Sequence, residues 1–400
     1  MTSEALSSAL HENYPQYQEQ ALTKRRFGHT TLVNLIQELQ QSALFDISLA
    51  CKSTEGRDIF LVKCGTGACK ILLWSQMHGD EATATMALFD LFNFLKASND
   101  AFDDLRKDLL EKCTFYVVPM LNPDGAEAWS RYTSLGIDMN RDALALQSPE
   151  SRLLKSLVMD LKPDFGFNLH DQGRRYSAGM TGNLATVSFL ATAYNEAQEI
   201  NETRKRAMQL IVLMNRGLQQ FIPNSVGKWP ADFEPRAFGD NVQKWGTSLI
   251  LVESGGYKND PEKLYIRQLN FVAILTALHA IASDTYQHED ISEYDSIPVN
   301  SKAIFDLIIR NVNLQKGDTC VNVDVAINRE ESPIKDSDGF KESSCIEEIG
   351  DMSIFFGTDE IDASGLTLFS EKEIKLGSTA NLQLQKEGRT IYTIKNGVII

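Results

Sequence analysis

The stretch KILLWSQMHGDEATATMALFDLF, residues 70–92, joins two apolar segments through a short polar turn. Residues 70–76 have the length and composition of a buried β-strand, and residues 82–96 are apolar on almost every side, as in a buried helix. Between them lie His78 and Glu81, an imidazole and a carboxylate that neither element requires. This junction predicts a strand followed by a helix, with polar chemistry placed where they meet.

Strands and helices continue to alternate up to about residue 285, which predicts an α/β fold. We expect a mixed, largely parallel central sheet with helices on both faces. The further predicted strands are 46–53, 58–64, 114–121, 165–169 and 247–252, and the further predicted helices are 149–162, 204–221 and 261–282.

The pattern of apolar and polar residues changes after an acidic linker. Residues 297–400 have few helical periods and many short alternating runs, which predicts a smaller β-rich domain. We therefore expect a catalytic domain over residues 1–285 and a C-terminal domain of unknown role over residues 297–400. The polar segment 329–344 is expected to be a surface loop.

Composition narrows the class of partner. The 400 residues carry 39 basic and 54 acidic side chains, a formal charge of −15, which argues against binding to nucleic acid or an anionic membrane. We find no run of about 18 uncharged apolar residues of the kind that spans a membrane. The N-terminal sequence lacks the pattern of a secretion signal, and the six cysteines lack metal-binding spacing, so we expect a cytoplasmic protein with reduced thiols. The oligomeric state is not indicated.

Several predicted strands end in polar residues that strand formation does not need. His78, Asn122, His170 and Glu253 each follow an apolar run. Ligands in open α/β sheets bind beyond the carboxyl ends of the strands, so parallel neighbours would bring these side chains into one crevice.

His78, Glu81 and His170 together have the composition of a catalytic zinc site. Two neutral imidazoles and one carboxylate leave the fourth position of a tetrahedral zinc ion open. Beside a metal, Glu253 would act as a general base. Each of these residues could instead have a purely structural role. The histidines could bond to the backbone, Glu81 could stabilise the first turn of a helix, and Glu253 could lie at the edge of a turn.

The loop between the two histidines, residues 122–143, is rich in hydrogen-bond donors. Arg131, Asn140 and Arg141 lie within it. Guanidinium groups bind carboxylates through two parallel hydrogen bonds, so these residues suit a substrate carboxylate and a developing oxyanion.

The order and type of these residues resemble the zinc carboxypeptidase family, the carboxypeptidase A-like metallopeptidases. The resemblance covers about residues 20–285. In chain order the matching positions are His78-Gly-Asp-Glu81, Asn122-Pro-Asp-Gly, Arg131, Asp138-Met-Asn140-Arg141, His170 and Glu253.

For the metal, the resemblance implies one Zn²⁺ per chain, held by His78, Glu81 and His170. Asp138 would orient the ring of His78 as a hydrogen-bond partner.

For the substrate, the resemblance implies that Arg131 polarises the scissile carbonyl. Asn140 and Arg141 would hold a substrate carboxylate, and Glu253 would be the base.

Two features depart from the family. The tyrosine that closes over substrate has no clear match, because the interval between His170 and Glu253 contains only Tyr176 and Tyr194, both early. The residues after His170 are Asp-Gln, where the digestive enzymes have Ser-Tyr.

We therefore predict zinc-dependent hydrolysis of a peptide-like amide, most simply by a metallocarboxypeptidase acting on substrates with a free carboxylate. The alternative enzyme is a zinc-dependent deacylase or amidase of small acyl-amino-acid or murein-peptide substrates. A non-catalytic zinc-binding module is a third reading, and the intact Glu253 argues against it.

Overall fold

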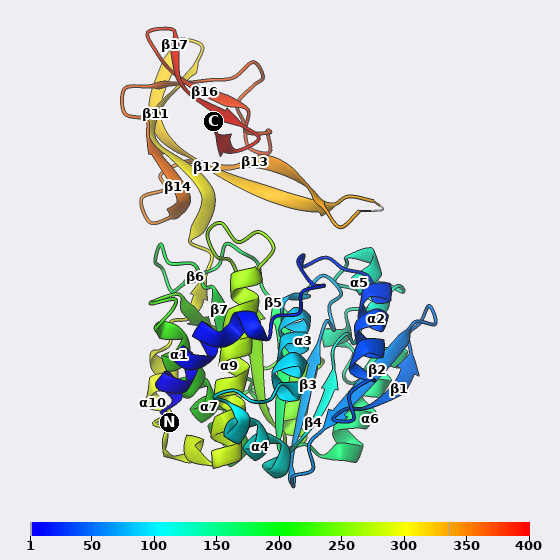
Figure 1. Ribbon diagram of the computed structural model, residues 1–400. Helices are drawn as coiled ribbons and strands as arrows, with labels where there is room; N and C mark the ends of the chain where they lie inside the picture. Colours follow the sequence, from blue (N-terminus) through cyan, green and yellow to red (C-terminus); the bar gives the residue numbers. More distant parts are fainter. Residues whose placement is uncertain (1, 336) are drawn as a thin grey trace. The chain divides into compact units, whose positions relative to one another are not determined.

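The computed structural model describes residues 2–335 and 337–400, which form two compact units (Figure 1). The first unit comprises the chain up to Arg174 together with Ala185–Val299. The second unit comprises Arg175–Leu184 and Asn300–Ile400. In addition to the C-terminal residues expected from the sequence, the second unit thus includes a segment that follows His170.

The first unit is built on an eight-stranded mixed sheet. In spatial order the strands are β1 (Asp46–Lys52), β2 (Asp58–Cys64), β4 (Cys113–Val118), β3 (Cys69–Ser75), β5 (Phe165–Asp171), β9 (Ser248–Ser254), β7 (Val187–Ala191) and β8 (Val226–Lys228).

The centre of this sheet is parallel and its flanks are partly antiparallel. β3 pairs in parallel with β4 and β5, and β5 pairs in parallel with β9. The pairs β1–β2, β2–β4 and β7–β9 are antiparallel, whereas β7–β8 is parallel. The predicted fold class is confirmed, and the parallel order brings the ends of β3, β4, β5 and β9 to one edge.

Helices cover both faces of the sheet, as expected for an α/β fold. The helices are α1 (Ser3–Asn13), α2 (His29–Leu39), α3 (Thr83–Lys96), α4 (Asp103–Lys112), α5 (Pro123–Ala128), α6 (Pro149–Leu161), α7 (Glu202–Gln219), α8 (Phe238–Lys244), α9 (Leu264–Ser283) and α10 (Ser292–Ser296).

Successive side chains of β3 point to opposite faces, each with its own apolar cluster. Ile71 and Leu73 join the larger cluster, to which α3, α7 and α9 contribute. Leu72 and Trp74 join the smaller cluster, to which α6 and α8 contribute. The sheet is therefore buried on both sides, which explains why β3 reads as a continuous apolar run.

Helix α9 qualifies by length and composition as a membrane-spanning candidate, contrary to the sequence-based expectation that no segment would. Its most apolar window is 78% buried inside the fold. The apolar character of α9 is therefore accounted for by packing in the core of the first unit.

The second unit contains an eight-stranded sheet and a two-stranded pair. The strands of the larger sheet are β11 (Ile304–Lys316), β12 (Thr319–Pro333), β13 (Phe340–Gly350), β14 (Phe356–Asp362), β15 (Thr367–Phe369), β16 (Leu382–Lys386), β17 (Arg389–Lys395) and β18 (Val398–Ile399). The smaller pair joins β6 (Ser177–Ala178) to β10 (Asn300–Ser301).

The expectation of a surface loop over residues 329–344 is wrong. β12 and β13 pair antiparallel as far as Pro333 opposite Phe340, so most of this segment is a hairpin. Most side chains of β13 are exposed or partly exposed, so the strand lacks the alternation of apolar and polar residues that marks a half-buried strand.

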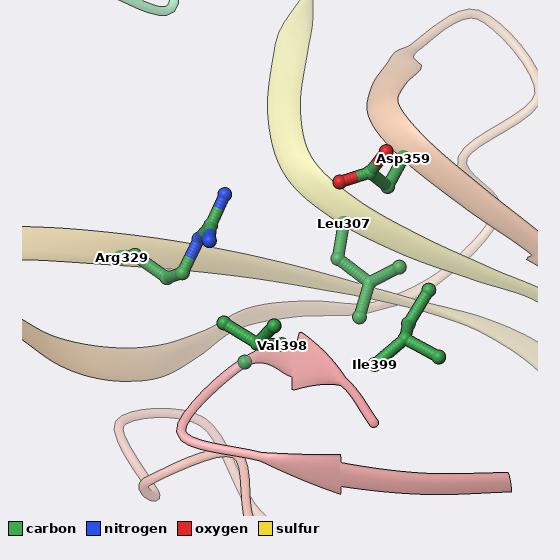
Figure 2. Close-up of a pocket in the computed structure, with 6 residues that line it drawn as sticks. Leu307, Arg329, Asp359, Val398 and Ile399 are labelled. Atoms are coloured by element: carbon green, nitrogen blue, oxygen red, sulfur yellow. The ribbon is translucent and has the colours of Figure 1, made fainter. Parts of the chain in front are cut away.

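A pocket of about 230 Å³ lies within the second unit. Figure 2 shows Arg329 and Asp359 on either side of apolar side chains from β11 and β18. The residues that line it are Leu307, Arg329, Asp359, Gly397, Val398 and Ile399. None of them belongs to the residues predicted to carry chemistry.

Candidate metal and substrate site

The turn after β3 presents His78 at the edge of the sheet. Gln76 has a positive φ of 47°, and its side-chain amide donates a hydrogen bond to the Gly79 carbonyl over 2.9 Å. A Cβ atom at Gly79 would lie 1.9 Å from the carbonyl carbon of Gly125. Only glycine permits this approach. The turn that carries His78 is therefore held against the Asn122-Pro-Asp-Gly turn that follows β4.

His78, Glu81 and His170 converge as predicted. His78 Nδ1 lies 2.8 Å from Glu81 Oε1, and His170 Nδ1 lies 2.6 Å from Glu81 Oε2. All three side chains are buried, and their potential ligand atoms lie within 4.8 Å of one another. Among the described residues, no second group of three such side chains is suited to hold a metal.

Burial and neighbouring charges shift the pKa values of all three residues in this cluster. Burial alone would raise the pKa of Glu81, but the neighbouring His78 and His170 hold it well below its usual value. Burial alone would lower the pKa of His78, but Glu81 and Asp138 raise it to about 9. Burial lowers the pKa of His170. A metal ion binds neutral imidazole, so binding here would displace the proton from His78.

The donor set fits zinc. Two imidazole nitrogens and one carboxylate, with an open fourth position, are the ligands of a catalytic zinc ion. Asp138 Oδ1 lies 3.2 Å from His78 Nε2, on the ring nitrogen opposite the one that faces Glu81. A carboxylate in this position fixes the ring orientation of a metal-binding histidine, which is the role predicted for Asp138.

Glu253 lies beside this cluster without joining it. β5 and β9 pair in parallel with His170 directly opposite Glu253. Oε2 of Glu253 is buried and has no hydrogen-bond partner. Burial, reinforced by the negative charge of Glu81, raises the pKa of Glu253 well above its ordinary value. A desolvated carboxylate with one unengaged oxygen is suited to accept a proton.

A buried ion pair ties the ends of β5 and β9 to α9. Lys263 Nζ donates to Asp171 Oδ2 over 3.0 Å and to the Ser254 carbonyl over 2.9 Å. Thr83 Oγ1 donates to the same Asp171 oxygen over 2.6 Å. The sequence analysis noted Asp171 only as a departure and missed Lys263, because a lysine 10 residues beyond Glu253 carries no signal of its partner.

Arg131 reaches the metal cluster from the loop after β4. Its Nε and Nη2 atoms each lie 3.0 Å from Asp138 Oδ2. Its Nη1 atom lies 3.6 Å from Glu81 Oε1. The same Nη1 atom lies 3.2 Å from His78 Nδ1, so Arg131 is close to two of the three candidate metal ligands.

Asn140 and Arg141 follow Asp138 in the same loop, but their contacts point to a neighbouring loop. Asn140 Oδ1 accepts a hydrogen bond from the Phe238 backbone over 2.9 Å. Arg141 Nε lies 3.5 Å from a carboxylate oxygen of Glu234. Glu234 is not among the residues that the sequence indicated, whereas Phe238 lies among the aromatic residues found where the family's tyrosine is missing.

Trp229, directly after β8, lies in the interval in which the family's tyrosine has no match. Trp229 donates through its indole nitrogen to Gln172 over 2.8 Å, and Gln172 donates to the Ala185 carbonyl over 2.8 Å. Gln172, one of the two residues that depart from the family after His170, is thus hydrogen-bonded to Trp229.

We predict that one zinc ion binds per chain through His78, Glu81 and His170. Replacing His170 with alanine removes one of three ligands, so zinc measured by mass spectrometry should fall from one per chain to a trace. His288→Ala, at an exposed position outside the cluster, is the matched control and should keep its zinc. Full zinc content in His170→Ala would rule out this ligand set.

Asp240 is a buried carboxyl that the sequence analysis did not identify. It lies in α8, and burial raises its pKa to about 7 despite the nearby Arg141. Between about pH 4 and pH 7 the folded protein keeps this proton while the unfolded chain has lost it. The folded state then binds more protons, so the stability contributed by this group falls as the pH rises across that window.

We predict that Asp240→Asn reduces the loss of stability between pH 5 and pH 8. Asparagine resembles the protonated acid, and the recovered free energy of unfolding should be on the order of 1–4 kcal/mol at pH 8. Denaturant unfolding at both pH values measures it. Asp232→Asn, an exposed position in the adjacent loop, should leave the pH dependence as it is. Equal pH profiles for Asp240→Asn and the unsubstituted protein would contradict the raised pKa.

Comparison with known proteins supports the resemblance. Residues 32–175 match the model of the zinc carboxypeptidase family. Carboxypeptidase 2 of Trichophyton tonsurans is 28% identical over 136 residues, which cover 33% of this chain and 24% of that protein. The chain thus spans about a quarter of the length of the relatives that it matches.

Solved structures show the same fold. The metallo-carboxypeptidase from Burkholderia cenocepacia superposes with a TM-score of 0.52 at 16% identity, covering 65% of this chain and 70% of that one. The metallo-carboxypeptidase from Pseudomonas aeruginosa, in complex with (2-guanidinoethylmercapto)succinic acid, gives a TM-score of 0.53 at 18% identity, covering 65% and 70%. The predicted resemblance to the zinc carboxypeptidase family is confirmed.

Proposed function

We propose, from its resemblance to the zinc carboxypeptidase family, that this protein is a zinc-dependent hydrolase of peptide or peptide-like amide bonds. More specifically, we propose a metallocarboxypeptidase that acts on substrates with a free carboxylate. The observation that carries the proposal is the position of Glu253. It lies opposite His170 in the sheet, beside a buried His-Glu-His cluster, with one carboxylate oxygen unengaged.

The residues divide the reaction between them. Zinc, when bound by His78, Glu81 and His170, supplies a Lewis acid that acidifies water and polarises a carbonyl. Glu253 accepts a proton from the attacking water. As the carbon–nitrogen bond breaks, Glu253 returns this proton to the leaving amine. Arg131 stabilises the negative charge that develops on the carbonyl oxygen.

A substrate carboxylate is bound at the other end of the same loop. Arg141 provides the cation, and its side chain is 40% exposed, so that a ligand can reach it. The Oδ1 atom of Asn140 is engaged by the Phe238 backbone, which leaves its amide nitrogen as the donor for the substrate. Retention of both residues supports a substrate with a free carboxylate.

The alternative is a deacylase or amidase of small acyl-amino-acid or murein-peptide substrates. The specific observation in its favour is that residues near the site differ from those of the family. Gln172 and Trp229 hold each other by a hydrogen bond in the network where family members carry other residues. This change affects which substrates fit and leaves the hydrolytic residues in place.

We predict that Glu253→Gln keeps zinc and substrate binding but loses turnover. Glutamine preserves size and hydrogen bonding but cannot accept a proton at neutral pH. A positioned acid–base group contributes about 10²–10⁴-fold, and a group used twice in one cycle should reach the upper end. Steady-state kinetics with zinc-loaded protein measure the kcat. Glu81→Gln is the contrasting variant, because it should lose zinc first. A Glu253→Gln protein that retains most of its kcat would show that this carboxylate is not the base.

We predict that amidation of the substrate C-terminus reduces kcat/KM about two- to fivefold, the scale of an exposed ion pair. The amide lacks the charge that pairs with Arg141, whose side chain is 40% exposed. Paired peptides that differ only in a free or an amidated C-terminus provide the measurement. Equal turnover of the two would favour the deacylase or amidase.

A further inference from the structure

Glu234 lies between two arginines at the carboxylate-binding end of the site. We propose that Glu234 occupies the position of the substrate carboxylate, and that Arg236 joins Arg141 in binding that carboxylate when substrate displaces Glu234. This inference rests on the proposed role of Arg141. It adds Arg236 as a second binding residue and makes Glu234 a competitor built into the chain.

The contacts show that one carboxylate fits both guanidinium groups. Arg236 Nε lies 3.0 Å from Glu234 Oε1, and Arg236 Nη2 lies 2.9 Å from Glu234 Oε2, a paired geometry typical of arginine and carboxylate. Arg141 Nε lies 3.5 Å from the same Oε2 atom. A carboxylate already sits where a substrate carboxylate would meet Arg141.

The backbone keeps the two arginines together. The Arg236 carbonyl accepts a hydrogen bond from the Ala143 backbone over 3.1 Å, two residues beyond Arg141. The Phe238 backbone donates to Asn140 Oδ1, which fixes the start of α8 to the same loop. Arg236 is therefore tied to the Arg141 loop by main-chain and side-chain contacts that do not depend on Glu234.

The charges favour competition over a permanent bond. Arg236 holds the pKa of Glu234 at about 2, so Glu234 is an anion at neutral pH. The side chains of Glu234, Arg141 and Arg236 are 30%, 40% and 58% exposed. Ion pairs of this exposure are weak, so a substrate carboxylate can replace Glu234 without large loss.

Removal of Glu234 should therefore improve binding, and removal of Arg236 in that background should weaken it. For the titrations, every protein carries Glu253→Gln to prevent hydrolysis of the ligands. The zinc-loaded protein is titrated by calorimetry with N-acetyl-phenylalanine, N-acetyl-leucine, N-acetyl-lysine and N-acetyl-glutamate, each beside its C-terminal amide. For the acids, Glu234→Gln should lower Kd about two- to fivefold, the scale of an exposed ion pair. Adding Arg236→Gln should raise Kd about two- to fivefold relative to Glu234→Gln, because the Arg236 side chain is 58% exposed.

The controls separate carboxylate binding from general effects on folding. The amides should bind each variant with the same Kd, because they lack the charge that Glu234 imitates. Glu202→Gln removes a glutamate whose side chain is 85% exposed at the start of α7, and it should leave every Kd as it is. With a substrate, the effect of Glu234→Gln should appear in KM, whereas a variant that only disturbed the fold would lower zinc content or kcat.

Two results would overturn the proposal. One is an unchanged or higher Kd for the acids in Glu234→Gln. The other is an equal Kd in Glu234→Gln and in Glu234→Gln with Arg236→Gln. Because binding is measured without turnover, a failure of the proposed function is distinguishable. The predicted order of affinities without peptide hydrolysis would leave this inference intact, and hydrolysis without that order would refute this inference alone.

Discussion

The contact between the backbones of Gly79 and Gly125 fixes the geometry on which the site depends. A side chain at Gly79 would overlap the main chain of Gly125, and the Gly79 backbone also donates to the Ser130 carbonyl over 2.9 Å. β3 and β4 are parallel neighbours, so the turns that follow them leave the same edge of the sheet. The glycine contact then sets how close these turns come. It places the loop of Arg131 and Asp138 within hydrogen-bond reach of His78.

A second constraint is electrostatic. Five carboxyl groups gather around the cluster, from Glu81, Asp138, Asp171, Asp80 and Glu253. Each of the first three has a cationic or imidazole partner: Glu81 has His78 and His170, Asp138 has Arg131, and Asp171 has Lys263. Buried charges persist only when they are paired and hydrogen-bonded. Asp80 and Glu253 are the exceptions among them, and buried carboxyls without such a partner are a feature of functional sites.

The sequence sufficed for those parts of the site that lie at strand ends. His78, His170 and Glu253 each close an apolar run, and the parallel order of β3, β5 and β9 brings them together without further information. The donor-rich loop indicated Arg131, and the resemblance to a known family assigned its role and added Asp138, which has no periodicity to mark it. Residues that neither end a strand nor match the family were not predicted. Glu234 and Asp240 reach the site because the Phe238 backbone bonds to Asn140, a tertiary contact between segments 98 residues apart.

The division of the chain into two units could also be predicted only in part from the sequence. The change in residue pattern near residue 297 indicated a second β-rich unit, but no local pattern marks Arg175–Leu184 as part of it. That segment is short, and its strand β6 has two residues. Its place follows from pairing with β10 and from Arg175, which donates to Asp306 over 3.1 Å and also contacts Glu330. Short strands defined by distant partners are beyond the reach of patterns read along the chain.

The pairing of β6 with β10 also means that β6 is synthesised before its partner strand. Ser177 and its partner Ser301 are separated by 124 residues, so a growing chain presents β6 well before β10 exists. At about 5–20 residues per second, the delay is roughly 6–25 s. Through that interval the segment directly after His170 lacks its final partner, although the strands that carry His78 and His170 have already been made. Asn300 and Ser301 thus complete the pairing of a segment that begins only five residues after His170 in the sequence.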